Sequence, residues 1–280
     1  MTDFQCLSCP VCHKPLIRQE RVLCCAQGHS FDIAAKGYVH LLLSQDMHSK
    51  DPGDSKEMVQ ARKRFLDKGY YAPLAQGLCT QFEKLLPQGM SESPLLVDAG
   101  CGDGYYTHTL HKFLTARCSD IRFLGLDISK EAIRLAAGRN KEIGFIVASL
   151  FKIPLQSESA HILINAFAPA CDSEFARVLK PKGYLITVIP GRDHLFELKK
   201  VLYDNPYLND EKEPELPSFT RENQVRVKQV IDINSAEDLK DLVLMTPYYW
   251  KTPKEGLERL SRLSSLNTGI EFVISIYSRK

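Results

Sequence analysis

The chain has 280 residues, of which 44% are hydrophobic and 25% are charged, and its formal net charge is +2. This length suffices for one large core, or for one core with a small appendage. The balanced charge excludes a histone-like polycation, so any surface that binds nucleic acid must be local. No stretch reaches the roughly 18 apolar residues that a membrane-spanning helix requires. Because the N-terminus also lacks the pattern of a secretory signal, we expect a cytoplasmic protein without a membrane partner.

Five of the nine cysteines lie within the first 25 residues. In a reducing compartment, an odd number of unevenly placed cysteines favours metal ligands over disulfides. Cys9 and Cys12 form a C-x2-C turn, Cys25 and His29 form a C-x3-H pair, and twelve residues lie between the two pairs. The segment LIRQERVLC between them predicts two short strands around a polar turn, which is the layout of a zinc ribbon.

We therefore predict one structural zinc ion held by Cys9, Cys12, Cys25 and His29, because four protein ligands leave no open position for water. The metal supplies folding free energy that so short a segment cannot obtain from a core of its own. Two alternatives stay open. Cys6 or Cys24 can replace one of these ligands, or the hairpin can hold reduced cysteines without a metal.

A polar stretch around Pro52-Gly53 marks a boundary, and a helix follows it. Asp54 is the expected N-cap, with Glu57 three residues on as in a capping box, and Gly69 ends the helix. Its apolar face repeats at helical spacing, at Met58, Ala61, Phe65 and Leu66. Its other face carries four basic residues, Arg62, Lys63, Arg64 and Lys68. For those four we favour a solvated surface over an RNA-contacting patch.

From Leu95 onward, short apolar runs alternate with helical stretches. The runs LLVDAG, FLGLDI, FIVAS, HILINAF and GYLITVI suit buried parallel strands, and KEAIRLAAGRN and SEFARVLK suit helices between them. QVRVKQVIDI, a helix near Ser235 and EFVISIYSR then suit the antiparallel edge of a doubly wound α/β sheet. Residues 204–218 are rich in Asp, Glu, Asn and Pro, and predict an exposed loop that can lie over a pocket.

Asp98 ends the first of these strands, and glycines follow at positions 100, 102 and 104. A glycine turn at this point lets the backbone approach a nucleotide-type ligand. A dinucleotide site requires a small residue where this chain has Tyr105, so a nicotinamide dehydrogenase is disfavoured. D-x-G-x-G-x-G is instead the motif of Rossmann-like methyltransferases that bind S-adenosylmethionine. Asp127 ends the next strand, about where a carboxylate accepts hydrogen bonds from both ribose hydroxyls.

Two further segments have the positions expected of such an enzyme. FIVASL lacks the acidic residue that often meets the adenine, so we expect backbone groups and apolar contacts from Leu150 and Phe151 there. NAFAPA follows the next strand, where residues facing the methyl acceptor are often found. It is neither the N-P-P-Y pattern of exocyclic-amine methylation nor the Pro-Cys motif of cytosine carbon-5 enzymes.

With the ribbon, DPGDSKEMVQARKRFLDKGYY, VDAGCGDGYYTH, NAFAP, RDHLFELK and LMTPYYW in view, the chain resembles the RlmA family over nearly its whole length. These are bacterial 23S rRNA (guanine-N1)-methyltransferases acting on a domain II hairpin. The resemblance implies a zinc-binding RNA-recognition domain (1–45), a linker and helical segment (46–94), and a Rossmann-like class I methyltransferase domain (95–280). It also implies a homodimer whose two zinc domains flank an RNA cleft. The expected cofactor contacts are Tyr71, Asp98, Gly100, Gly102, Asp103, Gly104, Asp127 and His194.

The family has two branches that methylate neighbouring guanines. Asn165 resembles the branch associated with macrolide resistance, whereas CGDGYYTH and ELKKVLY resemble the other, so the target guanine stays open. Neutral guanine N1 has no available lone pair, so methyl transfer requires loss of its proton. We predict Asn165 and His194 as catalytic residues, with Glu197 as a further candidate, and a base presented from a loop or flipped out.

Two other functions are compatible with parts of the sequence. A small-molecule methyltransferase would share the glycine turn, but this function would not explain why the chain has a zinc ribbon. A non-catalytic RNA-binding scaffold is disfavoured by the intact glycine motif and Asp127.

Overall fold

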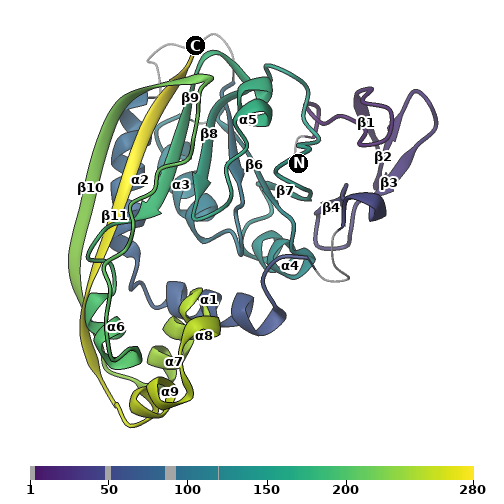
Figure 1. The fold of residues 1–280 in the computed structure, drawn as a ribbon. Coiled ribbons are helices and arrows are strands. Elements are labelled where there is room, and N and C mark those ends of the chain that lie inside the picture. Colours follow the sequence, from purple (N-terminus) through teal and green to yellow (C-terminus); the bar gives the residue numbers. More distant parts are fainter. Residues whose placement is uncertain (1–3, 48–51, 86–92, 119) are drawn as a thin grey trace.

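The computed structural model describes residues 4–47, 52–85, 93–118 and 120–280. Its main sheet has the strand order β10-β11-β9-β8-β5-β6-β7-β4 (Figure 1). The strands are β4 (Val39–His40), β5 (Leu95–Ala99), β6 (Arg122–Asp127), β7 (Gly144–Val147), β8 (Ala160–Ala166), β9 (Leu179–Pro190), β10 (Phe219–Ile233) and β11 (Leu266–Arg279). Strands β9 to β4 run parallel, and β11 is inserted antiparallel between β9 and β10. The predicted doubly wound sheet with an antiparallel edge is confirmed.

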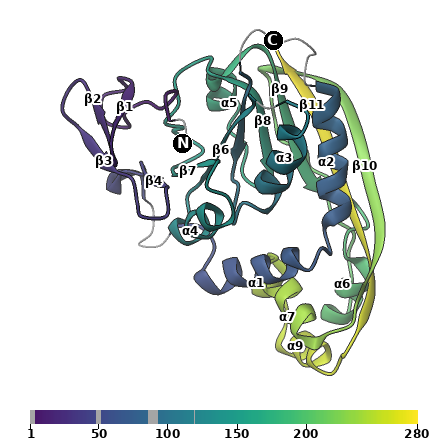
Figure 2. The ribbon, with the colours of Figure 1, turned by 180° about the vertical axis from the view of Figure 1, so that it is seen from behind.

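Helices cover the sheet and close one of its ends. They are α1 (Lys56–Asp67), α2 (Ala72–Leu85), α3 (Tyr105–Thr115), α4 (Lys130–Arg139), α5 (Asp172–Val178), α6 (Phe196–Leu202), α7 (Ala236–Leu244), α8 (Tyr248–Lys251) and α9 (Lys254–Ser261), with a 3-10 turn η1 (Ser44–Asp46). Helices α2 and α3 lie along one face of the sheet, as the two opposite views show (Figures 1 and 2). Helices α1, α6, α7, α8 and α9 gather beyond one end. Because α6 follows β9 closely, this is the end where the parallel strands terminate.

The N-terminal ribbon is part of the core on the opposite face of the sheet. Strands β1 (Leu16–Gln19), β2 (Val22–Cys25) and β3 (Ser30–Asp32) form its antiparallel sheet. Leu7 and Leu23 are fully buried in the same apolar cluster as Val97 and Leu124 of the main sheet. Ser8 N also donates to the carbonyl of Pro154 at 3.0 Å. The ribbon therefore shares a core with the larger domain instead of standing apart from it.

Two expectations about α1 are corrected. Its N-cap is Ser55, not Asp54: Ser55 has an extended backbone and its hydroxyl accepts from Met58 N at 3.2 Å, while the Asp54 carboxylate pairs with Arg62. The basic face is not simply solvated, because Arg64 binds Asp241 through two hydrogen bonds of 2.6 and 2.8 Å.

The other basic residues of α1 are paired as well. Lys68 Nζ donates to Asp238 at 2.5 Å, and Lys63 pairs with Asp67. Together with the Arg64 pair, the Lys68 pair ties α1 to α7, which the sequence places some 170 residues away. The helix expected in SEFARVLK ends at Val178 because β9 begins at the next residue. Within the described ranges, no helix combines the length and the apolar character needed to cross a membrane.

Candidate active site and zinc site

The four predicted zinc ligands meet in the ribbon. The ligand atoms of Cys9, Cys12, Cys25 and His29 all lie within 4.8 Å of one another. Cys25 Sγ lies 3.5 Å from Cys12 Sγ and 3.3 Å from His29 Nδ1. Tetrahedral coordination with bonds of about 2.0–2.3 Å places ligand atoms roughly 3.5–3.8 Å apart. The arrangement therefore fits a zinc ion that Nδ1 of His29 would ligate.

Local backbone geometry explains why these four residues converge. His13 N donates to Cys9 O at 2.9 Å, and Gly28 N donates to Cys25 O at 3.0 Å, which closes one tight turn at each pair. Gly28 has φ +83°, a conformation that favours glycine. Although burial raises the pKa of the Cys25 thiol, nearby backbone N–H groups and the Cys12 and His29 side chains bring it down to about 6.

The structure also bears on the two spare cysteines. Cys24 and Cys25 are successive residues of β2, so their side chains point to opposite faces. In the part of the chain that the structure describes, the Cys/His cluster comprises the four predicted ligands, and neither Cys6 nor Cys24 belongs to it. The predicted set is thus the one that the geometry favours.

The glycine turn lies between β5 and α3, and its three glycines have different tasks. A Cβ on Gly100 would stand 2.4 Å from Ala168 Cβ, and one on Gly104 would stand 2.8 Å from Ala136 Cβ. A Cβ on Gly102 would meet nothing within 4 Å. All three have positive φ. The outer glycines are therefore required by packing, whereas the middle one faces open space that a ligand can enter.

Two carboxylates hold this turn, a half-buried one at Asp127 and a buried one at Asp98. Asp127 Oδ2 accepts from Gly102 N at 2.9 Å, and its Oδ1 accepts from Ser129 N at 2.8 Å. Asp98 accepts from Thr107 Oγ1 at 2.5 Å, which ties the end of β5 to α3. Burial raises the pKa of both carboxyl groups, that of Asp98 to about 7.

Unsatisfied polar groups mark the crevice as a ligand site. Gly104, the N-cap of α3, gives the helix no side-chain cap, so N–H groups of the first turn are available. Among the described residues, the buried hydroxyl of Tyr106 has no hydrogen-bond partner. Asp103, by contrast, is engaged: Arg139 donates to its backbone carbonyl at 2.8 Å and pairs with its carboxylate. This combination suits a bound cofactor with polar groups.

Tyr71 and His194 come together from distant parts of the chain. Tyr71 Oη lies 3.3 Å from His194 Nε2, and Glu271 N donates to His194 Nδ1 at 3.2 Å. Burial lowers the pKa of His194 to about 3, so the ring is neutral. Because Nδ1 accepts, the ring proton sits on Nε2 and is donated to Tyr71. This tautomer leaves Nε2 no free lone pair and favours a positioning role for His194.

Asn165 lies at the end of β8 and faces a cavity. Its Nδ2 donates to Ala99 O at 2.9 Å and to Pro169 O at 3.3 Å. The cavity has a volume of about 480 Å³ and is lined by Asn165, Phe167, Ala168, Ala170, Thr187–Pro190 and Lys212–Glu215. That volume falls in the range of roughly 300–1,000 Å³ typical of ligand pockets. The predicted loop over residues 204–218 therefore does border a pocket.

The remaining predicted candidates fall into separate groups. Glu197 accepts from Gly269 N at 2.9 Å and from Thr268 Oγ1 at 3.2 Å, which makes it a tie between α6 and β11. The Phe272 ring lies between His194 and the segment that carries Asn165. Its centroid is 4.7 Å from that of the His194 ring and 5.7 Å from that of the Phe167 ring. Phe167 was not predicted, since no sequence pattern signals the positive φ of 58° that it adopts. Leu150 is buried beside Gly100, whereas Phe151 is exposed.

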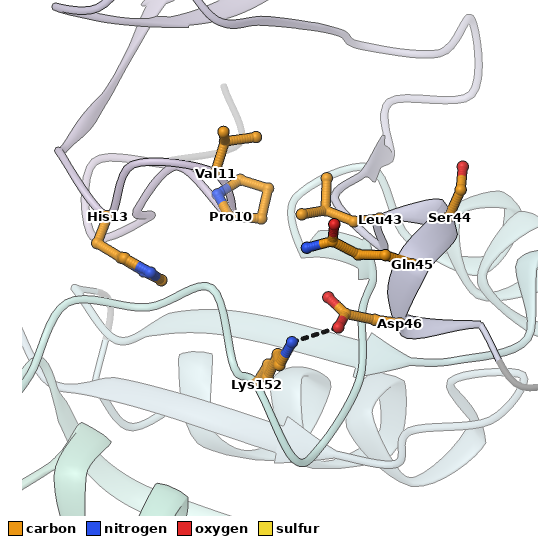
Figure 3. Close-up of a pocket in the computed structure, with 8 residues that line it drawn as sticks. All are labelled: Pro10, Val11, His13, Leu43, Ser44, Gln45, Asp46 and Lys152. Atoms are coloured by element: carbon orange, nitrogen blue, oxygen red, sulfur yellow. Dashed lines mark hydrogen bonds and ion pairs between the residues drawn. The ribbon is translucent and has the colours of Figure 1, made fainter.

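A second cavity lies where the ribbon meets the larger domain (Figure 3). Its volume is about 570 Å³, and it is lined by Pro10, Val11, His13, Leu43–Asp46 and Lys152. Figure 3 shows Lys152 and Asp46 pointing toward each other, and they form an ion pair. This contact joins η1 to the loop after β7 and helps to seat the ribbon.

The sheet order, the glycine turn after β5 and the carboxylate after β6 define the class: a class I S-adenosylmethionine-dependent methyltransferase that carries a zinc ribbon. The RlmA N-terminal family model matches residues 7–50, and a methyltransferase domain model matches residues 94–242. The 23S rRNA (guanine(748)-N(1))-methyltransferase of Streptomyces fradiae is 34% identical over 269 residues, covering 93% of this chain and 92% of that protein. The chain belongs to the RlmA family of 23S rRNA (guanine-N1)-methyltransferases.

Two further relatives are similar. A Micromonospora griseorubida protein, provisionally assigned as a 23S rRNA (guanine-N(1)-)-methyltransferase, is 39% identical over 207 residues, 69% of this chain and 68% of that protein. A Bacillus subtilis protein with the same provisional assignment is 28% identical over 282 residues, 98% of this chain and 97% of that protein.

Proposed function

We propose that this protein transfers the methyl group of S-adenosylmethionine to N1 of a guanine in a domain II hairpin of 23S rRNA. The observation that carries the proposal is the match along 93% of the chain to a guanine-N1 methyltransferase of 23S rRNA. The intact glycine turn and the Asp127 clamp support the same chemistry, because a degenerate domain would have no need to keep both.

The cofactor would lie across the carboxyl ends of β5 and β6 and supply a methyl group already activated by its sulfonium. Gly102 leaves room for it, and each Asp127 oxygen retains a second lone pair that can accept from a ribose hydroxyl. Tyr71 accepts from His194 and so can donate its own proton to the carboxylate of the cofactor. Asp98 supports the turn from beneath, and Asp103 supports it through Arg139.

Asn165 would orient the guanine. Both of its N–H donors are engaged by backbone carbonyls, so Oδ1 is the group that can accept from guanine N1–H. An amide oxygen is a weak base, and the proton needs a stronger acceptor. The cavity lining contains two carboxylates, Glu213 and Glu215. Because Arg221 pairs with Glu213 at 2.8 Å, we assign proton acceptance to Glu215.

The test is methyl transfer to RNA. We would incubate the zinc-loaded protein with tritiated S-adenosylmethionine and undermethylated 23S rRNA, then locate the product by primer extension, since 1-methylguanine cannot pair and stops the polymerase. A stop beside one domain II guanine supports the proposal and identifies which neighbour is modified. Label that appears only in small metabolites supports the small-molecule alternative, and bound cofactor without turnover supports the scaffold.

We also propose a cytoplasmic homodimer in which two ribbons flank the RNA. The support is the family resemblance together with the ribosomal RNA substrates named for the relatives. Light scattering should give twice the chain mass of 31.7 kDa, and a mass of one chain at micromolar concentration would exclude the dimer.

A further inference from the structure

Phe167 occupies an unfavourable position for an aromatic residue. Its backbone is left-handed, with φ 58°, and 45% of its surface is exposed to solvent. A bulky side chain rarely adopts positive φ, and such outliers cluster at functional sites. Exposure of an apolar ring adds a second cost. Neither backbone preference nor burial in the core therefore explains why a phenylalanine stands at this position.

The surrounding contacts hold the residue in this conformation. Phe167 N donates to Val188 O at 3.1 Å. Asn165, two residues earlier, is bound to Ala99 O at 2.9 Å. Ala168, one residue later, packs against Gly100, where any Cβ would stand 2.4 Å away. The segment that carries Phe167 is thus fastened directly to the cofactor turn.

Among the described residues, no aromatic ring stacks in parallel on the ring of Phe167. Its two aromatic neighbours meet it at tilted angles: Phe272 at 5.7 Å and 63°, and Tyr106 at 6.4 Å and 50°. Neither arrangement is a parallel stack. The ring also lines the cavity of about 480 Å³ that Asn165 faces. A flat, apolar ligand can therefore lie on Phe167 while its polar edge reaches Asn165.

The opposite boundary of this cavity is also anchored. We call residues 204–218 the strap, of which residues 212–215 line the cavity. Glu213 accepts from Arg221 at 2.8 Å and from Tyr277 Oη at 3.3 Å. Asn209 accepts from Lys199 Nζ at 2.6 Å and donates to Gly191 O at 2.9 Å. The cavity thus has two anchored boundaries, as a slot for a planar base requires.

We propose that Phe167 is the platform on which the target guanine stacks once it leaves the RNA helix. The inference rests on the proposed function and assigns the residue that captures the base. Stacking on an aromatic side chain compensates an unpaired base for lost base stacking. The Watson–Crick edge, which carries N1–H, then remains free to meet Asn165 Oδ1.

The experiment compares Phe167→Gly, Phe167→Leu and Phe167→Tyr in the zinc-loaded full chain. Glycine suits the left-handed backbone, so Phe167→Gly removes the ring without straining the fold. Leucine keeps apolar bulk without an aromatic face, and tyrosine keeps the face. The readouts are kcat/KM for a hairpin transcript, the Kd for S-adenosylmethionine by calorimetry, and the melting temperature. Tyr249→Leu, which replaces an exposed aromatic residue of α8 outside the cavity lining, is the matched control.

Stacking predicts that the glycine and leucine variants lose roughly 5- to 150-fold in kcat/KM for RNA. Their cofactor Kd and melting temperature should stay close to wild type, and the tyrosine variant should retain activity. Wild-type kcat/KM in both the glycine and the leucine variant would overturn the proposal. An equal loss in the tyrosine variant, or a loss that follows a lower melting temperature, would also overturn it.

A second readout separates this inference from the proposed function. 2-Aminopurine at the target position of the hairpin loses fluorescence when it stacks on an aromatic ring. The complex with wild type or Phe167→Tyr should emit less than the complex with Phe167→Gly, in which the extruded probe has no ring to stack on. If wild type quenches the probe but methylates no guanine, base capture stands and the proposed function fails. If the quench is the same in wild type and Phe167→Gly, the platform is wrong whatever the activity.

Discussion

At the scale of single residues, hydrogen bonds to the backbone determine which atoms of two polar side chains remain available. His194 shows the principle: a backbone N–H on Nδ1 sets its tautomer, and the opposite nitrogen then orients Tyr71. Asn165 follows the same principle, since both N–H groups of its side-chain amide donate to backbone carbonyls. The backbone hydrogen bonds leave Oδ1 of Asn165 for the ligand, and they leave Nε2 of His194 to donate to Tyr71.

His194 and Asn165 give a first prediction. His194→Ala should raise the Kd for S-adenosylmethionine, because Tyr71 loses its hydrogen-bond donor. Asn165→Ala should lower kcat at saturating cofactor by at least about tenfold, because two buried carbonyls lose their hydrogen-bond donor. With the pKa of His194 near 3, activity between pH 5 and 8 should show no step that His194→Gln removes. An unchanged Kd for S-adenosylmethionine in His194→Ala, together with near-normal kcat in Asn165→Ala, would contradict the assignment.

Asp98 gives a prediction about pH and stability. Burial raises its pKa to about 7 in the folded protein, against about 3.9 in an unfolded chain. The folded state then binds more protons between these values, so the free energy of unfolding falls as pH rises from 4 to 7. In Asp98→Asn this contribution, at most about 4 kcal/mol, should vanish. Urea unfolding of both cofactor-free proteins at pH 5 and pH 8 measures it, and identical pH dependence would refute it.

At the scale of elements, the strap borders the cavity that Asn165 faces. Lys199 is completely buried, and burial lowers its pKa to about 8. Its ammonium group donates to Tyr207 O at 3.0 Å and to Asn209 Oδ1 at 2.6 Å. Asn209 in turn donates to His194 O at 3.1 Å. The strap is thereby coupled to the backbone of a predicted cofactor-binding residue.

Asn209→Ala should therefore release the strap. Removing this amide leaves a buried ammonium group one acceptor short, which costs about 1–3 kcal/mol. We expect faster protease cleavage within residues 204–218 and a higher KM for RNA. Asn205→Ala, an exposed residue of the same type on the same strap, is the control. Equal cleavage rates and equal KM values in the two variants would show that Asn209 does not hold the strap.

Much of the fold could be predicted because its signals are local. The apolar runs marked β5 to β9, the glycine spacing marked the turn after β5, and the cysteine spacing marked the four residues that cluster in the ribbon. The cap of α1 was misassigned since Asp54 and Ser55 can both cap, and only the backbone angles distinguish them. The basic face of α1 is partly exposed as expected, but the ion pair of Arg64 was not predicted because its partner Asp241 lies on α7, far along the chain. Phe167 was missed because its conformation depends on contacts with Val188 and the glycine turn.

At the scale of the whole molecule, the ribbon and the larger domain share one apolar core. Apolar ribbon residues such as Leu7 and Leu23 complete the core on one face of the main sheet. β4 adds a parallel strand to the edge of that sheet beside β7. We propose that a ribbon held in place this way presents RNA to the crevice in a defined orientation.

Metal removal should therefore affect both parts together. Without zinc the thiolates lose the bonds that fold the ribbon, and the sheet face beneath it becomes exposed. We expect chelation, or Cys9→Ser, to lower the melting temperature of the entire protein in one calorimetric transition. Cys171→Ser, which lies outside the metal cluster, should leave it unchanged. Two separate transitions, with the larger one unaffected by the chelator, would contradict the shared core.

The central claim is that the crevice at the ends of β5 and β8 delivers a methyl group to guanine N1. The most direct measurement is mass spectrometry of nucleosides from 23S rRNA after reaction with S-adenosylmethionine bearing a deuterated methyl group. The account predicts deuterated 1-methylguanosine from one domain II position, and none when Asp127→Asn replaces the wild type. Deuterium in any other nucleoside, or an unlabelled RNA under conditions where calorimetry shows the cofactor bound, would contradict it.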